Sequence, residues 1–391
     1  MRELDPITRV SQPLRPARRR LTIAGFLGRV FGLALATAVV AGIGLVWAYF
    51  ILTAPGPLTE KKIVQIPKTA DRATIAAVLQ QQGVISGSRL FSTTALVDEQ
   101  YRHARLKPGE YEFPANASMS DVLSMLSRGD FVKYKVTIPE GWTSQMVVAR
   151  LNEQEMLDGA VSAVPAEGTL LPETYIVTRG YGRDKLLAEM AAAQTKLLEG
   201  AAARLPAGGV IKSKEELVTL AAIVEKETGV AEERPQVAAV FLNRLKQHIR
   251  LQSDPTVIYG IMGGKGKLDH PLTRDELDAE TPFNTYVIDG LPPSPIANPG
   301  KAAIEAVLNP ANVPYLYFVA NGTGGHAFAT TLEEHNANVK KWRALNGATD
   351  TSAAPPQKSG PLSTVVTPTA APPSKPTHKP ELTPLKKKII P

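Results

Sequence analysis

Two glutamates at the end of one apolar helix are the residues best placed to do chemistry. Residues 217–227 carry Leu, Ala and Val at helical spacing, and Ser213 is a suitable N-cap. At about 100° per residue, Glu227 continues the inward stripe, Glu225 lies to its side and Lys226 points away. Burial on such a face raises the pKa of a carboxyl group, because it disfavours the charged form. Glu227 is therefore a candidate general acid near neutral pH.

The same charges have a second interpretation, a solvated helix end, because charge runs on helices usually face water. Gly229, at a C-cap-like position, is expected to end the helix and to place Glu227 at the C-terminal end of the helix. A second polar cluster, residues 232–234, precedes another apolar helix expected over 237–245. The spacing alone leaves both interpretations open.

Other chemistries have weaker support. Six histidines show no ligand pair at helical spacing, so no metal is expected, and His326 and His335 are more typical of structural histidines. The absence of cysteine excludes disulfides and thiolate nucleophiles. Residues 263–267 (GGKGK) lack the Ser/Thr and the upstream glycine of a P-loop. Net charge is +7 but is concentrated at the two ends, so nucleic acid is not an expected partner.

An uncharged apolar stretch near the start, Val30–Leu52, predicts a membrane-spanning helix. At about 1.5 Å per residue it reaches roughly 34 Å, enough to cross a bilayer core. Trp47 and Tyr49 suit a membrane interface, and the arginines before the stretch favour a cytoplasmic N-terminus. A cleaved signal peptide has a shorter core and a small-x-small end, so we expect a retained single-pass anchor, with everything after Ala54 outside the cytoplasm.

After the predicted membrane anchor, the sequence repeats one pattern: a short strand that ends near a proline and is followed by a helix. The strands are expected at 62–67, 110–114 and 135–139, with helices at 75–82, 122–126 (capped by Ser120) and 144–151. Further along, we expect a helix over 184–204, a turn at Asp254–Pro255, a helix over 302–308, strands over 315–319 and 326–329, and a helix over 332–346.

The predicted fold class is α+β, in five segments. These are a basic cytoplasmic segment (1–29), a transmembrane helix (30–52), a small α/β module (60–135), a larger helix-rich α+β domain (136–346) and a disordered Pro/Lys-rich tail (347–391).

A series of short motifs runs through the chain in a fixed order. They are LPETY (171–175), VEKET (224–228), Glu233-Arg234, FLNRL (241–245), LQSDPTVIYG (251–260), FNTY (283–286), GLPPSPIANPG (290–300), YLYFVANGTGGHAF (315–328) and His335-Asn336. Together they resemble the YceG-like endolytic murein transglycosylases, from the anchor to about residue 346. Phe283 stands where the family commonly has Tyr, and Ser253 where it often has Thr.

The resemblance implies an activity, a site and a location. It implies a lytic transglycosylase that cleaves the MurNAc-β-1,4-GlcNAc bond within peptidoglycan strands, leaves 1,6-anhydro ends and terminates nascent strands. Glu227 matches the family's catalytic acid, and neither metal nor cofactor is required. The small module is similar to LysM, and the expected location is the bacterial inner membrane with a periplasmic catalytic domain. Expected partners are peptidoglycan, the membrane and peptidoglycan synthases.

Six polar residues are candidates to bind sugar or to orient Glu227. They are Glu225, Glu233, Arg234, Gln252, Asn284 and His326. Each has a structural alternative as an ordinary buried polar group. Two other functions stay open: a hydrolytic muramidase using Glu227 with Glu225 or Glu233, and a non-catalytic, membrane-tethered scaffold that binds peptidoglycan.

Overall fold

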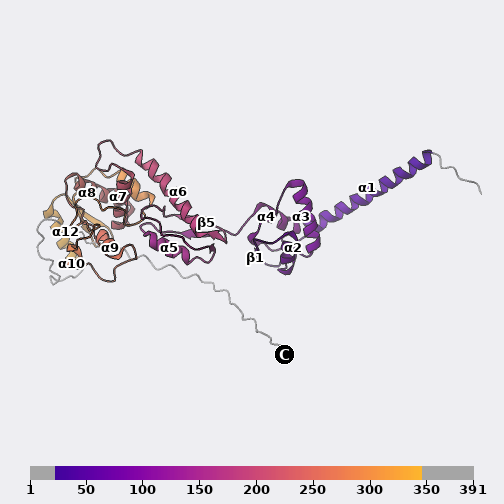
Figure 1. The fold of residues 1–391 in the computed structure, drawn as a ribbon, viewed down its shortest axis with the longest axis horizontal. Coiled ribbons are helices and arrows are strands. Elements are labelled where there is room, and N and C mark those ends of the chain that lie inside the picture. Colours follow the sequence, from indigo (N-terminus) through magenta and orange to yellow (C-terminus); the bar gives the residue numbers. More distant parts are fainter. Residues whose placement is uncertain (1–22, 346–391) are drawn as a thin grey trace, which may run out of the picture. The chain divides into compact units, whose positions relative to one another are not determined.

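The computed structural model describes residues 23–345 of the chain (Figure 1). Over these residues the fold is α+β, as predicted, with twelve α-helices and four two-stranded sheets. Two compact units divide between Val132 and Lys133, close to the predicted boundary after residue 135. The start of the predicted basic segment and the whole of the predicted tail lie outside the described residues.

The first helix, α1 (Ile23–Thr53), contains the predicted apolar stretch and begins earlier than Val30. Residues 26–53 are apolar and long enough to cross a membrane, and none of the most apolar part is buried by the rest of the structure. The last turn of α1 differs from the rest, because Leu52 packs against the core of the first unit. The helix therefore runs directly into folded structure.

The first unit pairs two strands and covers them with helices. Strand β1 (Lys62–Ile66) runs antiparallel to β2 (Gly109–Phe113). The helices are α2 (Arg72–Gln81), α3 (Ser88–Arg102) and α4 (Met119–Arg128). Large apolar and aromatic side chains from all of these elements form one core, including Ile66, Leu79, Phe91, Phe113 and Leu126.

The structure of this unit differs from the sequence-based expectations in two places. Helix α3 was not expected; only Phe91 and Ala95 along it are buried, so its periodic signal is weak. The N-cap of α4 is Ser118, which forms a capping box with Asp121, whereas Ser120 lies inside the first turn.

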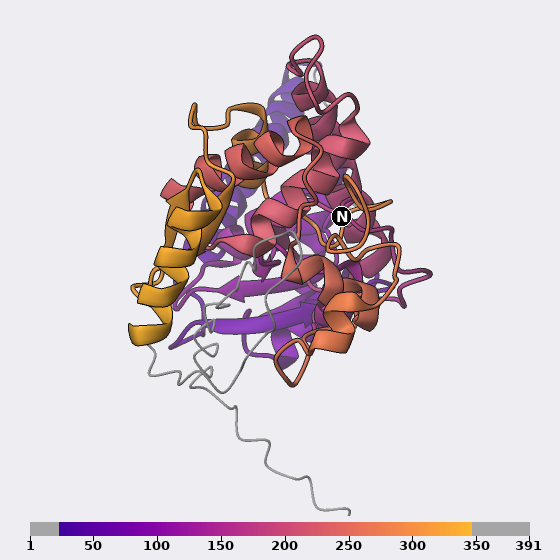
Figure 2. The same cartoon turned by 90° about the vertical axis from the view of Figure 1, so that its left-hand side faces the viewer.

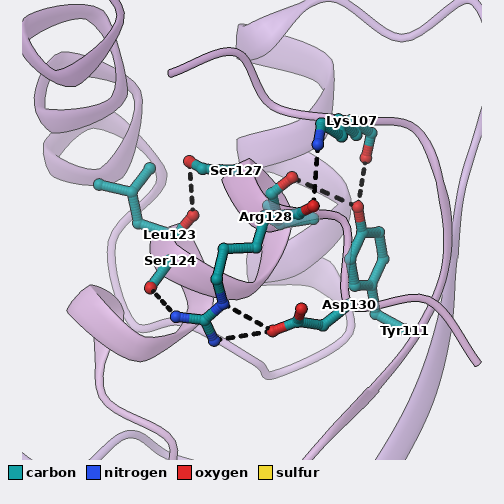
Figure 3. A network of polar contacts seen from close by, with 8 residues as sticks. Lys107, Tyr111, Leu123, Ser124, Ser127, Arg128 and Asp130 are labelled. Carbon is teal, nitrogen blue, oxygen red and sulfur yellow. Dashed lines mark hydrogen bonds and ion pairs between the residues drawn. The ribbon is translucent and has the colours of Figure 1, made fainter. Parts of the chain in front are cut away.

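Polar contacts fix the C-terminal end of α4, as Figure 3 shows. The Arg128 guanidinium donates to Asp130 at 2.7 and 3.0 Å and to Ser124 Oγ at 2.6 Å. Lys107 Nζ donates to the Arg128 carbonyl, and the Tyr111 hydroxyl donates to the Lys107 carbonyl. The buried tyrosine thus joins β2 to the end of the helix, and burial raises its pKa.

The second unit begins with two small sheets. Strand β3 (Tyr134–Thr137) pairs antiparallel with β5 (Thr174–Val177), and β4 (Leu157–Asp158) pairs parallel with β6 (Tyr181–Gly182). Helices α5 (Ser144–Asn152) and α6 (Arg183–Ala202) pack with them. The third strand–helix repeat therefore belongs to a different sheet from the first two.

The rest of the second unit is mainly helical and surrounds α7 (Lys214–Glu227). The other elements are η1 (Ala231–Glu233), α8 (Arg234–Lys246), α9 (Asp254–Met262), α10 (Arg274–Asp278), α11 (Lys301–Leu308), β7 (Tyr317–Ala320), β8 (His326–Ala329) and α12 (Leu332–Leu345). Helix α7 packs against α6, α8, α9 and α11, and Figure 1 shows α7 beside α8. Helix α12, yellow-orange in Figure 2, covers the antiparallel β7–β8 pair.

Helix α7 is buried all round rather than on one stripe. Every residue from Leu217 to Val224 is buried. Even Lys226, expected to point away, is only partly exposed and donates from Nζ to the Gly141 carbonyl at 3.4 Å. The helix ends at Glu227 with an extended Thr228 as its C-cap, so the expected glycine cap at Gly229 is wrong.

The expected turn at Asp254–Pro255 is also wrong, because these residues begin α9. Proline fits the first turn of a helix, where its missing N–H has no intrahelical partner to lose.

Candidate active site

Glu227 lies in the interior of the second unit. It is the last residue of α7, and only 3% of it is exposed. The solvated helix end is therefore the wrong interpretation for this residue. Its inward face follows from the apolar residues one and two turns earlier, Val224 and Leu220, which are completely buried.

The two carboxyl oxygens of Glu227 have different surroundings. Ser253 Oγ donates a hydrogen bond of 2.5 Å to Oε1. Oε2 is buried and has no hydrogen-bond partner among the described residues. A buried charge without partners is costly, whereas a neutral acid group tolerates this position much better. The geometry therefore favours protonated Glu227.

The electrostatics agree with this geometry. Burial raises the pKa of Glu227 to about 8. The hydrogen bond from Ser253 opposes the rise, the charge of Asp254 adds to it, and Arg244 opposes it. At pH 7 the group is mainly protonated, which is the state that a general acid needs.

Arg244 is a buried cation that holds several segments together. It comes from α8 and is 4% exposed. Its Nε donates to the Leu316 carbonyl at 2.6 Å, and its Nη1 donates to the carbonyls of Arg250 and Leu251 and to Gln252 Oε1. Burial lowers its pKa to about 10. Its guanidinium also lies over the Tyr317 ring, 5.3 Å from the centroid.

A second acid–hydroxyl pair lies beside Glu227. The Tyr286 hydroxyl donates to Asp254 Oδ1 at 2.6 Å. Burial raises the pKa of Tyr286 well above its ordinary value, and the charge of Asp254 adds to this effect. The phenol therefore stays protonated and keeps donating to Asp254, whose negative charge helps to hold the proton on Glu227.

Glu225 and Arg234, two predicted site residues, contact each other. Glu225 Oε2 accepts from the Gly300 N–H at 2.9 Å, and its Oε1 lies 3.5 Å from Arg234 Nη2. Arg234 also lies 3.7 Å from Glu140. Burial raises the pKa of the Glu225 carboxyl, while Gly300 and Arg234 lower it. These contacts connect the end of α7 to the start of α8 and to the N-cap of α11.

Glu233 and His326 form a separate pair. Glu233 Oε2 lies 2.7 Å from His326 Nδ1, and its Oε1 accepts from the His326 backbone N–H at 2.8 Å. The pair fastens η1 to the first residue of β8. Neither residue contributes to the raised pKa of Glu227.

Gln252 and Asn284 form hydrogen bonds with residues of the loops around the site. Gln252 has a φ of 55°, and its backbone N–H donates to the Thr285 carbonyl. Asn284 is completely buried; its Nδ2 donates to the carbonyls of Leu277 and Ala279, and its Oδ1 accepts from the Tyr286 N–H. Both donor hydrogens of Asn284 are thereby used within the loop.

The residues that interact with Glu227 were not among the predicted site residues. They are Ser253, Arg244, Asp254 and Tyr286. For Arg244 a signal existed: it follows the buried Val237 by seven positions and Val240 by four, so it continues an inward face just as Glu227 does. For Ser253 and Asp254 the contact depends on tertiary folding, and no local pattern marks it.

The arrangement can donate and accept a proton at one carboxyl group. Within residues 23–345, no group of three or more His, Asp or Glu side chains is placed to hold a metal ion. The buried carboxyl group of Glu227, with its raised pKa, is suited to general acid–base catalysis.

Comparison with known proteins assigns the chain to a family. A model of the YceG-like family matches residues 64–341, which is most of the chain. This protein belongs to the YceG-like family.

Curated relatives carry an enzyme name. The endolytic murein transglycosylase of Bacillus subtilis is 29% identical over 312 residues, covering 71% of this chain and 84% of the relative. The Streptococcus pneumoniae D39 protein of the same name is 29% identical over 328 residues, covering 71% of this chain and 57% of the relative. Among solved structures, a YceG-like protein from Listeria monocytogenes is 30% identical with a TM-score of 0.44, covering 71% of this chain and 99% of that one.

Proposed function

We propose that this protein is an endolytic lytic transglycosylase that cleaves the MurNAc-β-1,4-GlcNAc bond within peptidoglycan strands. The observation that carries the proposal is Glu227, a buried acid with a pKa raised to about 8 and one carboxyl oxygen that has no hydrogen-bond partner within residues 23–345. It lies in a chain of the YceG-like family, whose curated relatives are named endolytic murein transglycosylases.

A single carboxyl group supports both halves of the reaction. Protonated Glu227 gives its proton to the glycosidic oxygen, so the bond from that oxygen to C1 of the muramic acid breaks. The resulting Glu227 carboxylate then takes the proton of the muramic acid 6-hydroxyl, whose oxygen bonds to C1. The product is a 1,6-anhydro ring, the enzyme regains its proton, and no water is consumed.

Access to Glu227 requires a local movement. Its Oε2 is enclosed by protein atoms in the free structure. The glycan therefore reaches this oxygen only after neighbouring side chains are displaced. Exclusion of water from such a site favours capture of C1 by the 6-hydroxyl over hydrolysis.

A hydrolytic muramidase is the alternative with the same acid. It needs a second carboxylate free to act on the other side of the sugar ring. The two expected partners are held elsewhere: Glu225 bonds Gly300 and Arg234, and Glu233 bonds His326. Asp254 acts on the pKa of Glu227, but its Oδ1 accepts the Tyr286 hydroxyl. These contacts favour the transglycosylase.

Location and domain roles complete the proposal. The apolar α1 supports a single-pass anchor in the inner membrane, with a cytoplasmic N-terminus and a periplasmic catalytic unit. The residues between α1 and Val132 belong to one compact unit, which we propose contains the expected LysM-like module. Peptidoglycan synthases are the proposed partners, and termination of nascent strands is the proposed role.

The decisive experiment uses the full chain in detergent, incubated with purified sacculi. Mass spectrometry of the products distinguishes 1,6-anhydro ends from reducing ends, which are heavier by one water. The proposal expects anhydro ends from the parent protein and none from Glu227→Gln. Reducing ends would establish the muramidase, and an inactive but folded parent would favour the non-catalytic scaffold.

A further inference from the structure

The hydroxyl of Ser253 has an unusual partner for its position. Ser253 is the N-cap of α9, where a serine side chain ordinarily accepts from the backbone N–H of the second or third helical residue. Here the side chain makes no cap hydrogen bond. Its Oγ donates instead to Glu227 Oε1 at 2.5 Å, across 26 positions of the chain. The helix therefore lacks a stabilising side-chain cap, and the hydroxyl donates its hydrogen bond to Glu227 instead.

The backbone of Ser253 is held on both sides. Its N–H donates to Thr285 Oγ1 at 2.9 Å, and its carbonyl accepts from Thr256 Oγ1 at 2.6 Å. The hydroxyls of Thr256 and Thr285 lie 2.8 Å apart, so the two anchors also hold each other. All three residues are completely buried. The position of the Ser253 hydroxyl is therefore set by the protein before any substrate arrives.

We propose that Ser253 is a positioning residue for Glu227, holding Oε1 so that Oε2 is the oxygen that carries the transferred proton. This proposal rests on the function proposed above for Glu227. In a neutral carboxyl group, one oxygen accepts hydrogen bonds and the other carries the hydrogen. Because the Ser253 hydroxyl donates to Oε1, the hydrogen belongs on Oε2, the oxygen for which the described part of the chain offers no partner.

The same bond assists the second half of the reaction. When Oε2 has given up its proton, the negative charge spreads over both oxygens, and the hydrogen bond from Ser253 to Oε1 becomes charge-assisted and stronger. It thus stabilises the carboxylate during the interval before the 6-hydroxyl returns a proton. Without Ser253, the anion has less stabilisation and the carboxyl group can rotate.

Other titratable groups surround Glu227. Asp254 from α9 raises its pKa and Arg244 from α8 lowers it, while the charge of Glu227 raises the pKa of Tyr286 in the loop after α10. The hydroxyl of Tyr286 is directed to Asp254, and the nitrogens Nε and Nη1 of Arg244 are directed to backbone carbonyls and Gln252. Among the described residues, it is Ser253 that donates a hydrogen bond to the Glu227 carboxyl group.

The test compares Ser253→Ala and Ser253→Thr with Thr219→Val in the full chain. Thr219 is a matched control, since its hydroxyl is on α7, is buried, and donates to the Glu215 carbonyl instead of Glu227. We expect Ser253→Ala to lower kcat by about tenfold or more with little change in KM, because a misplaced catalytic group costs rate. Ser253→Thr retains a hydroxyl and restores most of kcat, and Thr219→Val matches the parent.

The pH profile separates positioning from a structural role. The bond from Ser253 lowers the pKa of Glu227, so its loss in Ser253→Ala moves the alkaline limb of kcat to higher pH. The proposal is overturned if Ser253→Ala keeps the kcat of the parent and the alkaline limb of its pH profile does not move. If Ser253→Ala does not fold, as judged by circular dichroism, Ser253→Cys carries the test, because a thiol is a weaker donor of similar size.

Failure of the proposed function is distinguishable from failure of this inference. If the parent forms anhydro ends and Glu227→Gln does not, while Ser253→Ala behaves as the parent, only the role of Ser253 is overturned. If the parent forms no anhydro ends, the proposed function fails. In that case an NMR titration of the Glu227 carboxyl still tests the bond, which requires its pKa to rise in Ser253→Ala.

Discussion

Glu225 and Glu227 are two residues apart on α7, and their carboxyl groups have different partners. Glu225 accepts from the Gly300 N–H at 2.9 Å and faces Arg234 at 3.5 Å. Glu227 accepts from the neutral hydroxyl of Ser253, and its second oxygen has no partner among the described residues. Burial raises the pKa of both groups, but a cation and a backbone N–H oppose it directly at Glu225. These differences support our proposal that Glu227, rather than Glu225, is the proton donor.

The activity should depend on pH through Glu227. Its pKa of about 8 means that the acid form is lost as pH rises through that value. The charge of Asp254 raises this pKa, so Asp254→Asn should shift the alkaline limb to lower pH, with a roughly threefold loss of kcat/KM at pH 8.5 relative to the parent. Asp289→Asn, whose carboxyl is 85% exposed and pairs with Arg250, is the control. If the alkaline limb of the pH–activity profile does not move in Asp254→Asn, the effect of the Asp254 charge on the pKa of Glu227 is contradicted.

The raised pKa of Glu227 lowers the stability of the folded protein at neutral pH. The folded-state pKa of about 8 lies above the ordinary 4.5, so the folded state binds more protons between these values and its stability falls as pH rises through this window. Glu227→Gln removes the ionisable group. The stability of Glu227→Gln relative to the parent should therefore rise between pH 4.5 and pH 8, by on the order of 5 kcal/mol in total. Thermal unfolding across this range measures the difference, and parallel curves for the two proteins would contradict it.

Arg244→Lys should destabilise the second unit. The guanidinium donates to three backbone carbonyls, those of Leu316, Arg250 and Leu251, and a lysine ammonium cannot reach all of them with the same geometry. Leaving buried carbonyls unpaired should cost about 3 kcal/mol or more. Urea unfolding checks the value. The control is Arg204→Lys, whose side chain is half exposed and pairs with Glu305, and its cost should stay within about 1 kcal/mol.

Asn298→Ala should loosen a junction of three segments. The buried Asn298 accepts from the Leu170 N–H at 3.0 Å and donates to the Trp142 carbonyl and Ser144 Oγ, both at 3.1 Å. Its loss should cost about 2–4 kcal/mol, because these buried groups lose their partner. Urea unfolding followed by tryptophan fluorescence measures it. Asn309→Ala, an exposed asparagine after α11, should change stability by less than about 0.5 kcal/mol.

Local patterns predicted much of the fold. The apolar α1, the β7–β8 hairpin and the buried helix α7 were all expected, because each has a strong periodic or turn signal within a few residues. Helix α3 was missed since its sequence is mostly polar and buries few residues. The sequence predicts a turn at the start of α9, because Asp-Pro fits both a turn and the first turn of a helix.

The site could be predicted only in part. Burial of Glu227 follows from its spacing after Leu220 and Val224, which a sequence displays directly. Its partner Ser253 is far along the chain, in a loop whose shape is set by Thr285 and by a residue of positive φ, Gln252. No spacing rule connects residues brought together by folding. The site roles proposed for the other candidates remain predictions.

The junction of α1 with the first unit has a mechanical consequence. Leu52 packs into that unit's core, and the chain just beyond it is hydrogen-bonded, with the Gly56 N–H donating to the Asn116 carbonyl. No slack segment separates helix from module. With α1 embedded in a bilayer, the first unit would lie directly at the membrane surface. A force applied to this unit would then act on the packing of Leu52 and on the lipid around α1.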